Sequence, residues 1–199
     1  RLLNLFQNRI PDPVDYIEMR RKTFGAKLAL GLFWLRHGRE LPPELLAARA
    51  MSELEHSAAD YVCLVNDIFS YQKELEFEGE LNNFVLVVQR FLDLEPPQAV
   101  AVVNDLMTAR LRQFEHVVAV ELPHLCQELH LAPAVYETLR EYVSRLQQWM
   151  CGALQWHVRV GRYNEPELHL AWNPLRLSGR PTGPGTAAAG IAARLARAE

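Results

Sequence analysis

Three residues with oxygen-bearing side chains recur at every fourth position between residues 66 and 74: Asn66, Ser70 and Glu74. Residues four apart lie on one face of an α-helix, so an amide carbonyl, a hydroxyl and a carboxylate would form one row. Mg²⁺ prefers such hard oxygen ligands and completes its shell with water or phosphate oxygens. Lys73 could add a positive charge beside a bound phosphate. The spacing therefore predicts a Mg²⁺ site, although it also suits a solvated polar stripe.

The elements that would position this row are helices, because apolar residues recur with helical spacing along the chain and no run of strand-like alternation is evident. Asp12 before Pro13 is a good helix start. Asn82 is the expected cap of the fourth helix, and Pro123 is expected to end the fifth. The acidic segment 74–80 is expected to be a loop. The predicted helices span residues 13–37, 43–49, 51–75, 83–92, 96–121 and 133–163, and the predicted fold class is all-α.

Composition limits the partners of the chain. Its net charge is −3 over 199 residues, so no basic field favours nucleic acid or an anionic membrane surface. No apolar run reaches the roughly 18 residues of a membrane span. Three dispersed cysteines argue against a disulfide scaffold and predict a cytoplasmic protein. We expect residues 1–165 to be helical and residues 166–199, rich in Pro and Gly, to be a flexible tail or interdomain linker.

The segment Asn66–Glu74 resembles the second metal motif of class I terpene synthases, N-D-x-x-S-x-x-K-E, at every defined position. Longer stretches are similar to the N-terminal, germacradienol-forming domain of bacterial germacradienol/geosmin synthases, and the tail at 181–187 is similar to the linker after that domain. The stretches are Tyr16–Gly25, Asn66–Leu92, Arg112–Val117, Trp156-His157 and Arg162-Tyr163.

The resemblance implies the C-terminal part of the class I terpenoid synthase helical barrel and a Mg²⁺-dependent sesquiterpene cyclase acting on farnesyl diphosphate in the geosmin pathway. By the resemblance, Asn66, Ser70 and Glu74 bind Mg²⁺ and Lys73 contacts diphosphate. Arg162 and Tyr163 resemble the pair that closes over the diphosphate. A second terpene synthase domain could follow the tail.

The family also has an arginine upstream of the metal helix that senses the diphosphate, and Arg20 and Arg21 are the candidates. Adjacent helical residues point about 100° apart, so counting cannot choose between them. We favour Arg21, because Gly25 one turn later could supply the helix break that the family has near this arginine. Two adjacent arginines also suit a plain solvated surface.

Aromatic residues recur every seven positions near the end of the last predicted helix: Trp149, Trp156 and Tyr163. Such a face could stabilise carbocations through the ring quadrupoles, or it could simply be a packing seam. His157 and His116 are expected to be hydrogen-bonded structural residues.

The family's first, aspartate-rich metal motif is absent from this sequence, so the chain alone could be inactive. A non-catalytic helical domain is therefore an alternative. A di-iron helical bundle is a second one, since Glu53 with His56 and Glu121 with His124 have E-x-x-H spacing, although Pro123 should break the second pair.

Overall fold

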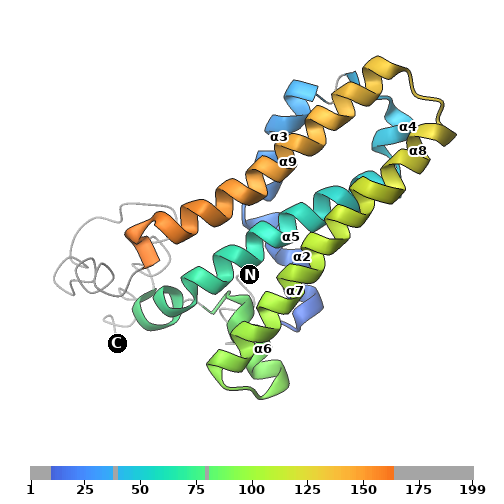
Figure 1. Cartoon of the computed structure of the whole chain (residues 1–199). Helices are drawn as coiled ribbons and strands as arrows, with labels where there is room; N and C mark the ends of the chain where they lie inside the picture. The colour runs from blue at the N-terminus through green and yellow to red at the C-terminus, as the bar shows by residue number, and fades with distance from the viewer. Residues whose placement is uncertain (1–9, 38–39, 79–80, 164–199) are drawn as a thin grey trace, which may run out of the picture.

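The computed structural model describes residues 10–37, 40–78 and 81–163, and it is all-α over these ranges, with no strand among them (Figure 1). This confirms the predicted fold class. The predicted tail at 166–199 lies outside the described residues. The elements are α2 (Pro13–Thr23), α3 (Ala26–His37), α4 (Pro43–Leu46), α5 (Arg49–Gln72), η2 (Lys73–Glu78), α6 (Phe84–Leu92), α7 (Pro96–His116), η3 (Val117–Glu121), α8 (Leu122–Glu128), α9 (Pro133–Arg159) and η4 (Gly161–Tyr163).

Helix α5 is the centre of the fold, with α9 on one side and α7 on the other (Figure 1). One hydrophobic cluster joins α5 to α9, and it includes Leu54, Tyr142 and Leu146. A second cluster joins α5 to α2, α6 and α7 around Tyr16 and Leu64. Burying each such large side chain stabilises the fold by about 1.5–3 kcal/mol. The two clusters determine which faces of α2 and α9 lie against α5, near Asn66, Ser70 and Glu74.

The predicted helix over residues 13–37 is interrupted, because α2 ends at Thr23 and α3 begins at Ala26. Gly25 lies between them with a φ of +89°, a conformation that side-chain-bearing residues rarely adopt. The start of α2 is as predicted: the Asp12 carboxylate accepts hydrogen bonds from Val14 N at 2.8 Å and Asp15 N at 3.1 Å. The break gives α2 and α3 separate directions, so residues on α2 can face α5 independently of α3.

Two π-helical turns correct further expectations. The start of the acidic segment is not a loop, since Lys73–Glu78 continues α5 as the π-helical turn η2. Pro123 does not end its helix either. In the π-helical turn η3, the Leu122 N–H donates to Val117 O five residues back, and Pro123 then falls in the first turn of α8. A proline is tolerated there because its missing N–H is not needed.

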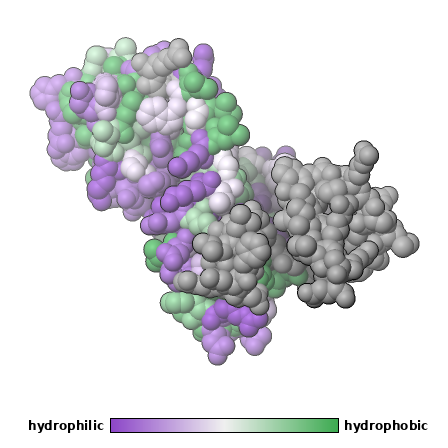
Figure 2. Space-filling model, turned by 180° about the vertical axis from the view of Figure 1, so that it is seen from behind, coloured by the Kyte–Doolittle hydropathy of each residue, from purple (hydrophilic) through white to green (hydrophobic). Residues whose placement is uncertain are grey.

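Hydrophobic side chains also reach the surface, as the green areas in Figure 2 show. Three of the described ones, Leu28, Leu32 and Leu35, are exposed at positions that share one side of α3. The opposite side carries Phe33 and Trp34, which pack on the cluster between α5 and α9. None of the described helices combines the length and the apolarity that a membrane span requires.

Candidate metal centre

The predicted oxygen row exists, and it lies where α5 passes into the π-helical turn η2. Asn66 and Ser70 lie on the last turns of α5, and Glu74 lies on the first turn of η2. Ser70 is buried and the other two are half-buried, so the row faces the protein more than the solvent. Burial raises the pKa of Glu74, while hydrogen bonds from Asn83 and Ser70 lower it. The Ser70 and Glu74 oxygens are therefore neighbours, as two ligands of one cation must be.

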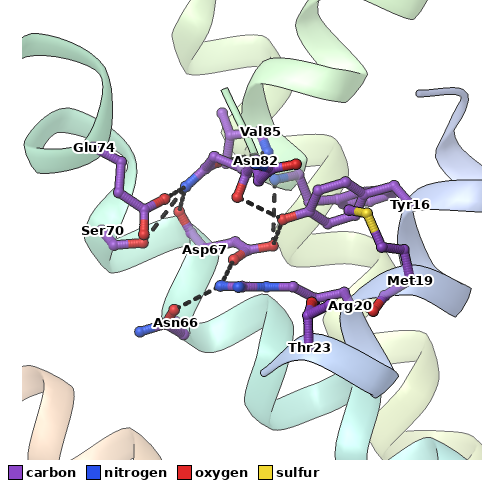
Figure 3. A network of polar contacts seen from close by, with 12 residues as sticks. Tyr16, Met19, Arg20, Thr23, Asn66, Asp67, Ser70, Glu74, Asn82 and Val85 are labelled. Carbon is purple, nitrogen blue, oxygen red and sulfur yellow. Dashed lines mark hydrogen bonds and ion pairs between the residues drawn. The ribbon is translucent and has the colours of Figure 1, made fainter. Parts of the chain in front are cut away.

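Arg20 is the cation that reaches this row from α2 (Figure 3). Its Nη2 donates to Asn66 Oδ1 at 2.8 Å and to Asp67 Oδ1 at 2.5 Å. Its guanidinium also lies over the ring of Phe24, 4.9 Å from the centroid. Its Nε is buried and has no hydrogen-bond partner among the described residues. A buried donor without a partner is unfavourable, so this edge of the guanidinium is suited to an anion.

Arg21 points elsewhere. Its Nε and Nη2 donate to the two carboxylate oxygens of Asp60 at 2.6 and 2.7 Å. Arg110 of α7 donates to Asp60 Oδ2 through Nε at 2.7 Å and Nη2 at 2.5 Å. One buried carboxylate thus joins α2, α5 and α7. The structure therefore separates the two candidate arginines: Arg20 contacts the motif, while Arg21, which the sequence favoured, makes a clamp with Asp60.

Asp67, the fully buried second residue of the motif, is a functional candidate that the sequence analysis did not single out. The Tyr16 hydroxyl lies 2.8 Å from Asp67 Oδ2 and 2.9 Å from Asn82 O, so its single proton is shared between two acceptors (Figure 3). Phe84 N also donates to Asp67 Oδ2 at 3.2 Å. Burial raises the pKa of Asp67, and the Arg20 charge opposes that shift. Asp67 anchors Arg20 beside Asn66. Its position inside the motif was the feature of the sequence that could have identified it.

Asn83 is another residue that sequence reasoning missed. The cap of α6 is Asn83 and not Asn82, because Asn83 Oδ1 accepts from Val85 N at 2.9 Å. Its Nδ2 donates to Asp67 O at 2.8 Å and to Glu74 Oε2 at 2.9 Å, and it lies 3.5 Å from Ser70 Oγ. A side chain outside the motif therefore holds Glu74 in one orientation.

The end of α9 closes the other side of Asn66. Asn66 Nδ2 lies 3.0 Å from His157 Nε2 and donates to the Tyr163 hydroxyl at 3.3 Å. The imidazole stacks on the Tyr163 ring, with centroids 5.4 Å apart and planes 9° apart. Burial lowers the pKa of His157, which keeps the ring neutral near pH 7. Tyr163 thus lies at the motif, and the exposed Arg162 lies with its guanidinium carbon 6.0 Å from the Tyr163 centroid.

The aromatic residues spaced by seven do not form one continuous face. Trp156 contacts Tyr163 edge-on, with centroids 6.0 Å apart, and about half of Trp156 is exposed. Trp149 instead packs against Phe33 of α3, with centroids 6.1 Å apart. Trp149 and Trp156 are two turns apart on α9, about 10.5 Å along its axis, so their rings have different neighbours, whereas Tyr163 lies beyond the end of α9 on the separate turn η4 and contacts Trp156. Only Trp156 and Tyr163 of the predicted set are neighbours.

The donor set of the row fits a hard divalent cation. It offers an amide oxygen, a hydroxyl oxygen and a carboxylate from one continuous helical segment, and Lys73 follows Gln72 at the end of α5. The structure does not assemble the Glu and His residues of the di-iron alternative into one site. His124 is exposed, Glu121 lies 3.8 Å from His116, and no group of three His, Cys, Asp or Glu in the described part of the chain could hold a metal.

Comparison with known proteins identifies the family of the chain. Residues 2–113 match the family model described as terpene synthase family 2, C-terminal metal binding. The chain is 34% identical over 149 residues to an isoafricanol synthase of Streptomyces violaceusniger. The aligned region covers 75% of this chain and 38% of that protein. It is 33% identical over 154 residues to sesquiterpene synthase 1 of Postia placenta, covering 77% of this chain and 43% of that protein.

Among solved structures, germacradien-4-ol synthase from Streptomyces citricolor superposes with a TM-score of 0.66 at 26% identity, over 75% of this chain and 47% of that one. The chain spans about two fifths of the length of the curated relatives named above. The family match and the relatives show that the chain belongs to the terpene synthase family, whose matching model is described as its C-terminal metal-binding region.

Proposed function

We propose that this chain supplies the second metal site of a Mg²⁺-dependent sesquiterpene cyclase that ionises farnesyl diphosphate. Asn66 Oδ1, Ser70 Oγ and the Glu74 carboxylate would hold one Mg²⁺. When bound, Mg²⁺ would neutralise negative charge on the departing diphosphate. The family membership and the names of the relatives support the reaction class.

The observation that carries the proposal is the position of Arg20. A guanidinium has only donors, and here it contacts the oxygen of a proposed metal ligand while its buried Nε has no partner among the described residues. A diphosphate oxygen would satisfy that donor and would lie beside the cation bound by the row. We therefore assign diphosphate contact to Arg20, and a structural role to Arg21 through its clamp with Asp60.

Other residues of the chain would act around the leaving group. Lys73 would supply a point charge to the diphosphate. Arg162 and Tyr163 would donate to it and close the site, which excludes water from the reacting cation. The half-exposed ring of Trp156, beside Tyr163, would stabilise positive charge by about 0.5–2 kcal/mol. Trp149 would act in the same way only if its ring turned from Phe33.

We further propose a germacradienol-type product in the geosmin pathway, in a cytoplasmic protein whose residues 166–199 link this domain to a second terpene synthase domain. This proposal rests on the resemblance of the motif segment and the tail to the germacradienol/geosmin synthases that the sequence analysis describes. The aspartate-rich motif would come from residues outside this sequence, so the chain alone would make no terpene.

The test is product analysis by gas chromatography after the natural protein that contains this chain is incubated with farnesyl diphosphate and Mg²⁺. We expect a cyclic sesquiterpene, and a severe loss of turnover in Asn66→Leu, Ser70→Ala and Glu74→Gln, because an inner-sphere ligand is removed from a catalytic metal. Glu137→Gln is the matched control, since Glu137 is a largely exposed residue of α9 that pairs only locally with Arg140. Wild-type rates in all three motif variants at saturating Mg²⁺ would exclude the metal assignment.

A further inference from the structure

The Asn66 side-chain amide has two chemically different ends, and the structure gives each end a different partner. Oδ1 accepts from Arg20 Nη2 at 2.8 Å. Nδ2 faces His157 Nε2 at 3.0 Å. Arginine offers only donors, so the end of the amide that meets Arg20 must be the oxygen. Arg20 at one end, and two acceptors at the other, His157 Nε2 at 3.0 Å and the Tyr163 hydroxyl at 3.3 Å, together fix the orientation of the amide.

The state of the His157 ring follows from its second nitrogen. Nδ1 lies 2.7 Å from the carbonyl oxygen of Ala153, one turn earlier on α9. A carbonyl can only accept, so Nδ1 carries the proton. In a neutral imidazole Nε2 then has a free lone pair and accepts the hydrogen bond from Asn66 Nδ2. The two contacts are mutually consistent and specify one tautomer.

Packing prevents the ring from turning away. His157 is 5% exposed. Its ring stacks on Tyr163, lies 5.5 Å from Phe69 and meets Trp156 edge-on at 4.8 Å between centroids. Its hydrogen bond to Ala153 stays within α9, whereas Phe69 and Asn66 belong to α5, so the ring is held between the two helices. The imidazole is thus held rigidly, with one lone pair aimed at one metal-site residue.

We propose that His157 is a positioning residue that orients Asn66 for metal binding, by keeping Nδ2 turned away and Oδ1 turned toward the cation. The inference rests on the proposed function, since it requires Asn66 to be a ligand. Without the acceptor at His157, only Arg20 and the longer 3.3 Å contact with the Tyr163 hydroxyl hold the amide. Its NH₂ group, which cannot bind a cation, is then more easily turned toward the metal. Loss of such an outer contact typically weakens metal affinity by about 10–100-fold.

The variant that isolates this role is His157→Phe, which keeps an aromatic ring against Tyr163 and Phe69 but removes both nitrogens. We expect Mn²⁺ binding in the presence of inorganic diphosphate, followed by electron paramagnetic resonance, to weaken by about 10-fold or more. The melting temperature serves as the measure of folding and should change little. His116→Phe is the control, because His116 is 55% exposed at the far end of α7. Equal Mn²⁺ binding in His157→Phe and the wild type overturns the proposal.

A second variant separates positioning from packing. In Asn66→Asp both ends of the side chain are oxygens, so orientation no longer matters. We therefore expect His157→Phe to weaken Mn²⁺ binding in the protein that retains Asn66, but not to weaken it when it is combined with Asn66→Asp, since a carboxylate oxygen has no proton to donate to Nε2. The same loss in both backgrounds would show that His157 acts only through packing, and this result overturns the proposal.

The tautomer gives a test that needs no metal and no variant. Nitrogen-15 NMR of the imidazole should show His157 protonated at Nδ1 and unprotonated at Nε2, whereas a proton on Nε2 contradicts the proposal. Asn66→Leu distinguishes the two levels of inference. If it leaves Mn²⁺ binding intact, the proposed function fails; if it abolishes binding while His157→Phe does not, only the role of His157 fails.

Discussion

The clamp around Asp60 allows a quantitative prediction about stability. Asp60 is 1% exposed and accepts hydrogen bonds from Arg21 and Arg110 on two different helices. Asp60→Asn keeps the size of the side chain but removes its charge and turns one acceptor into a donor. Breaking a fully buried ion pair destabilises proteins by about 3–5 kcal/mol. The two arginine side chains are 22% and 26% exposed and can recruit water, so we expect a loss of about 2–3 kcal/mol here.

Thermal unfolding followed by circular dichroism measures this loss. For a chain of this size, each kcal/mol shifts the melting temperature by about 2–4 °C, so Asp60→Asn should melt roughly 4–12 °C below the wild type. Glu137→Gln breaks the largely exposed pair with Arg140 and should change stability by less than about 1 kcal/mol. If Asp60→Asn melted within a degree or two of the wild type, the clamp would not hold α2 on α5, and the structural role assigned to Arg21 would be refuted.

Three further outcomes can be measured on the same protein. Asn83→Ser keeps a good helix cap but cannot reach Glu74 or Asp67 O, so Mn²⁺ binding should weaken and the free energy of unfolding should fall by about 1–3 kcal/mol; unchanged binding would contradict the role of Asn83. Glu55→Ala removes the acceptor of the buried Tyr142 hydroxyl and should lower the free energy of unfolding by about 1–3 kcal/mol, as measured in urea. Burial lowers the pKa of His157 in the folded state. Below the ordinary histidine pKa of about 6.5, the unfolded state therefore binds more protons than the folded state. The free energy of unfolding should consequently fall as the pH drops below that value. His157→Phe should flatten this part of the pH profile, and an unaltered profile would show that another group causes it.

The fold class and the row on α5 could be predicted because both depend on local sequence. Helical spacing places Asn66, Ser70 and Glu74 on one face wherever the helix lies. The start of α2 at Asp12 and Pro13 could also be predicted, because an N-cap side chain forms its hydrogen bonds within the first turn of its own helix. The π-helical turns could not be predicted from the sequence. Pro123 normally ends a helix, and only the wide turn η3 before it allows the chain to continue.

The choice between Arg20 and Arg21 needed tertiary structure. The two residues are adjacent and point about 100° apart, so how α2 packs on α5 decides which of them faces the oxygen row. That packing is set by Tyr16 and Asp60, which lie far apart in the sequence. His157 and Asn66 are likewise 91 positions apart, so no local pattern could pair them.

The central claim is that the row on α5 binds a divalent cation together with diphosphate. The most direct measurement is a crystal structure of the protein with Mn²⁺ and inorganic diphosphate, in which anomalous scattering locates the metal. We predict a Mn²⁺ ion bound to Asn66 Oδ1, Ser70 Oγ and the Glu74 carboxylate, with a diphosphate oxygen accepting from Arg20 Nε. An ordered Mn²⁺–diphosphate pair bound elsewhere, with Arg20 unchanged and the three oxygens free of metal, would contradict it.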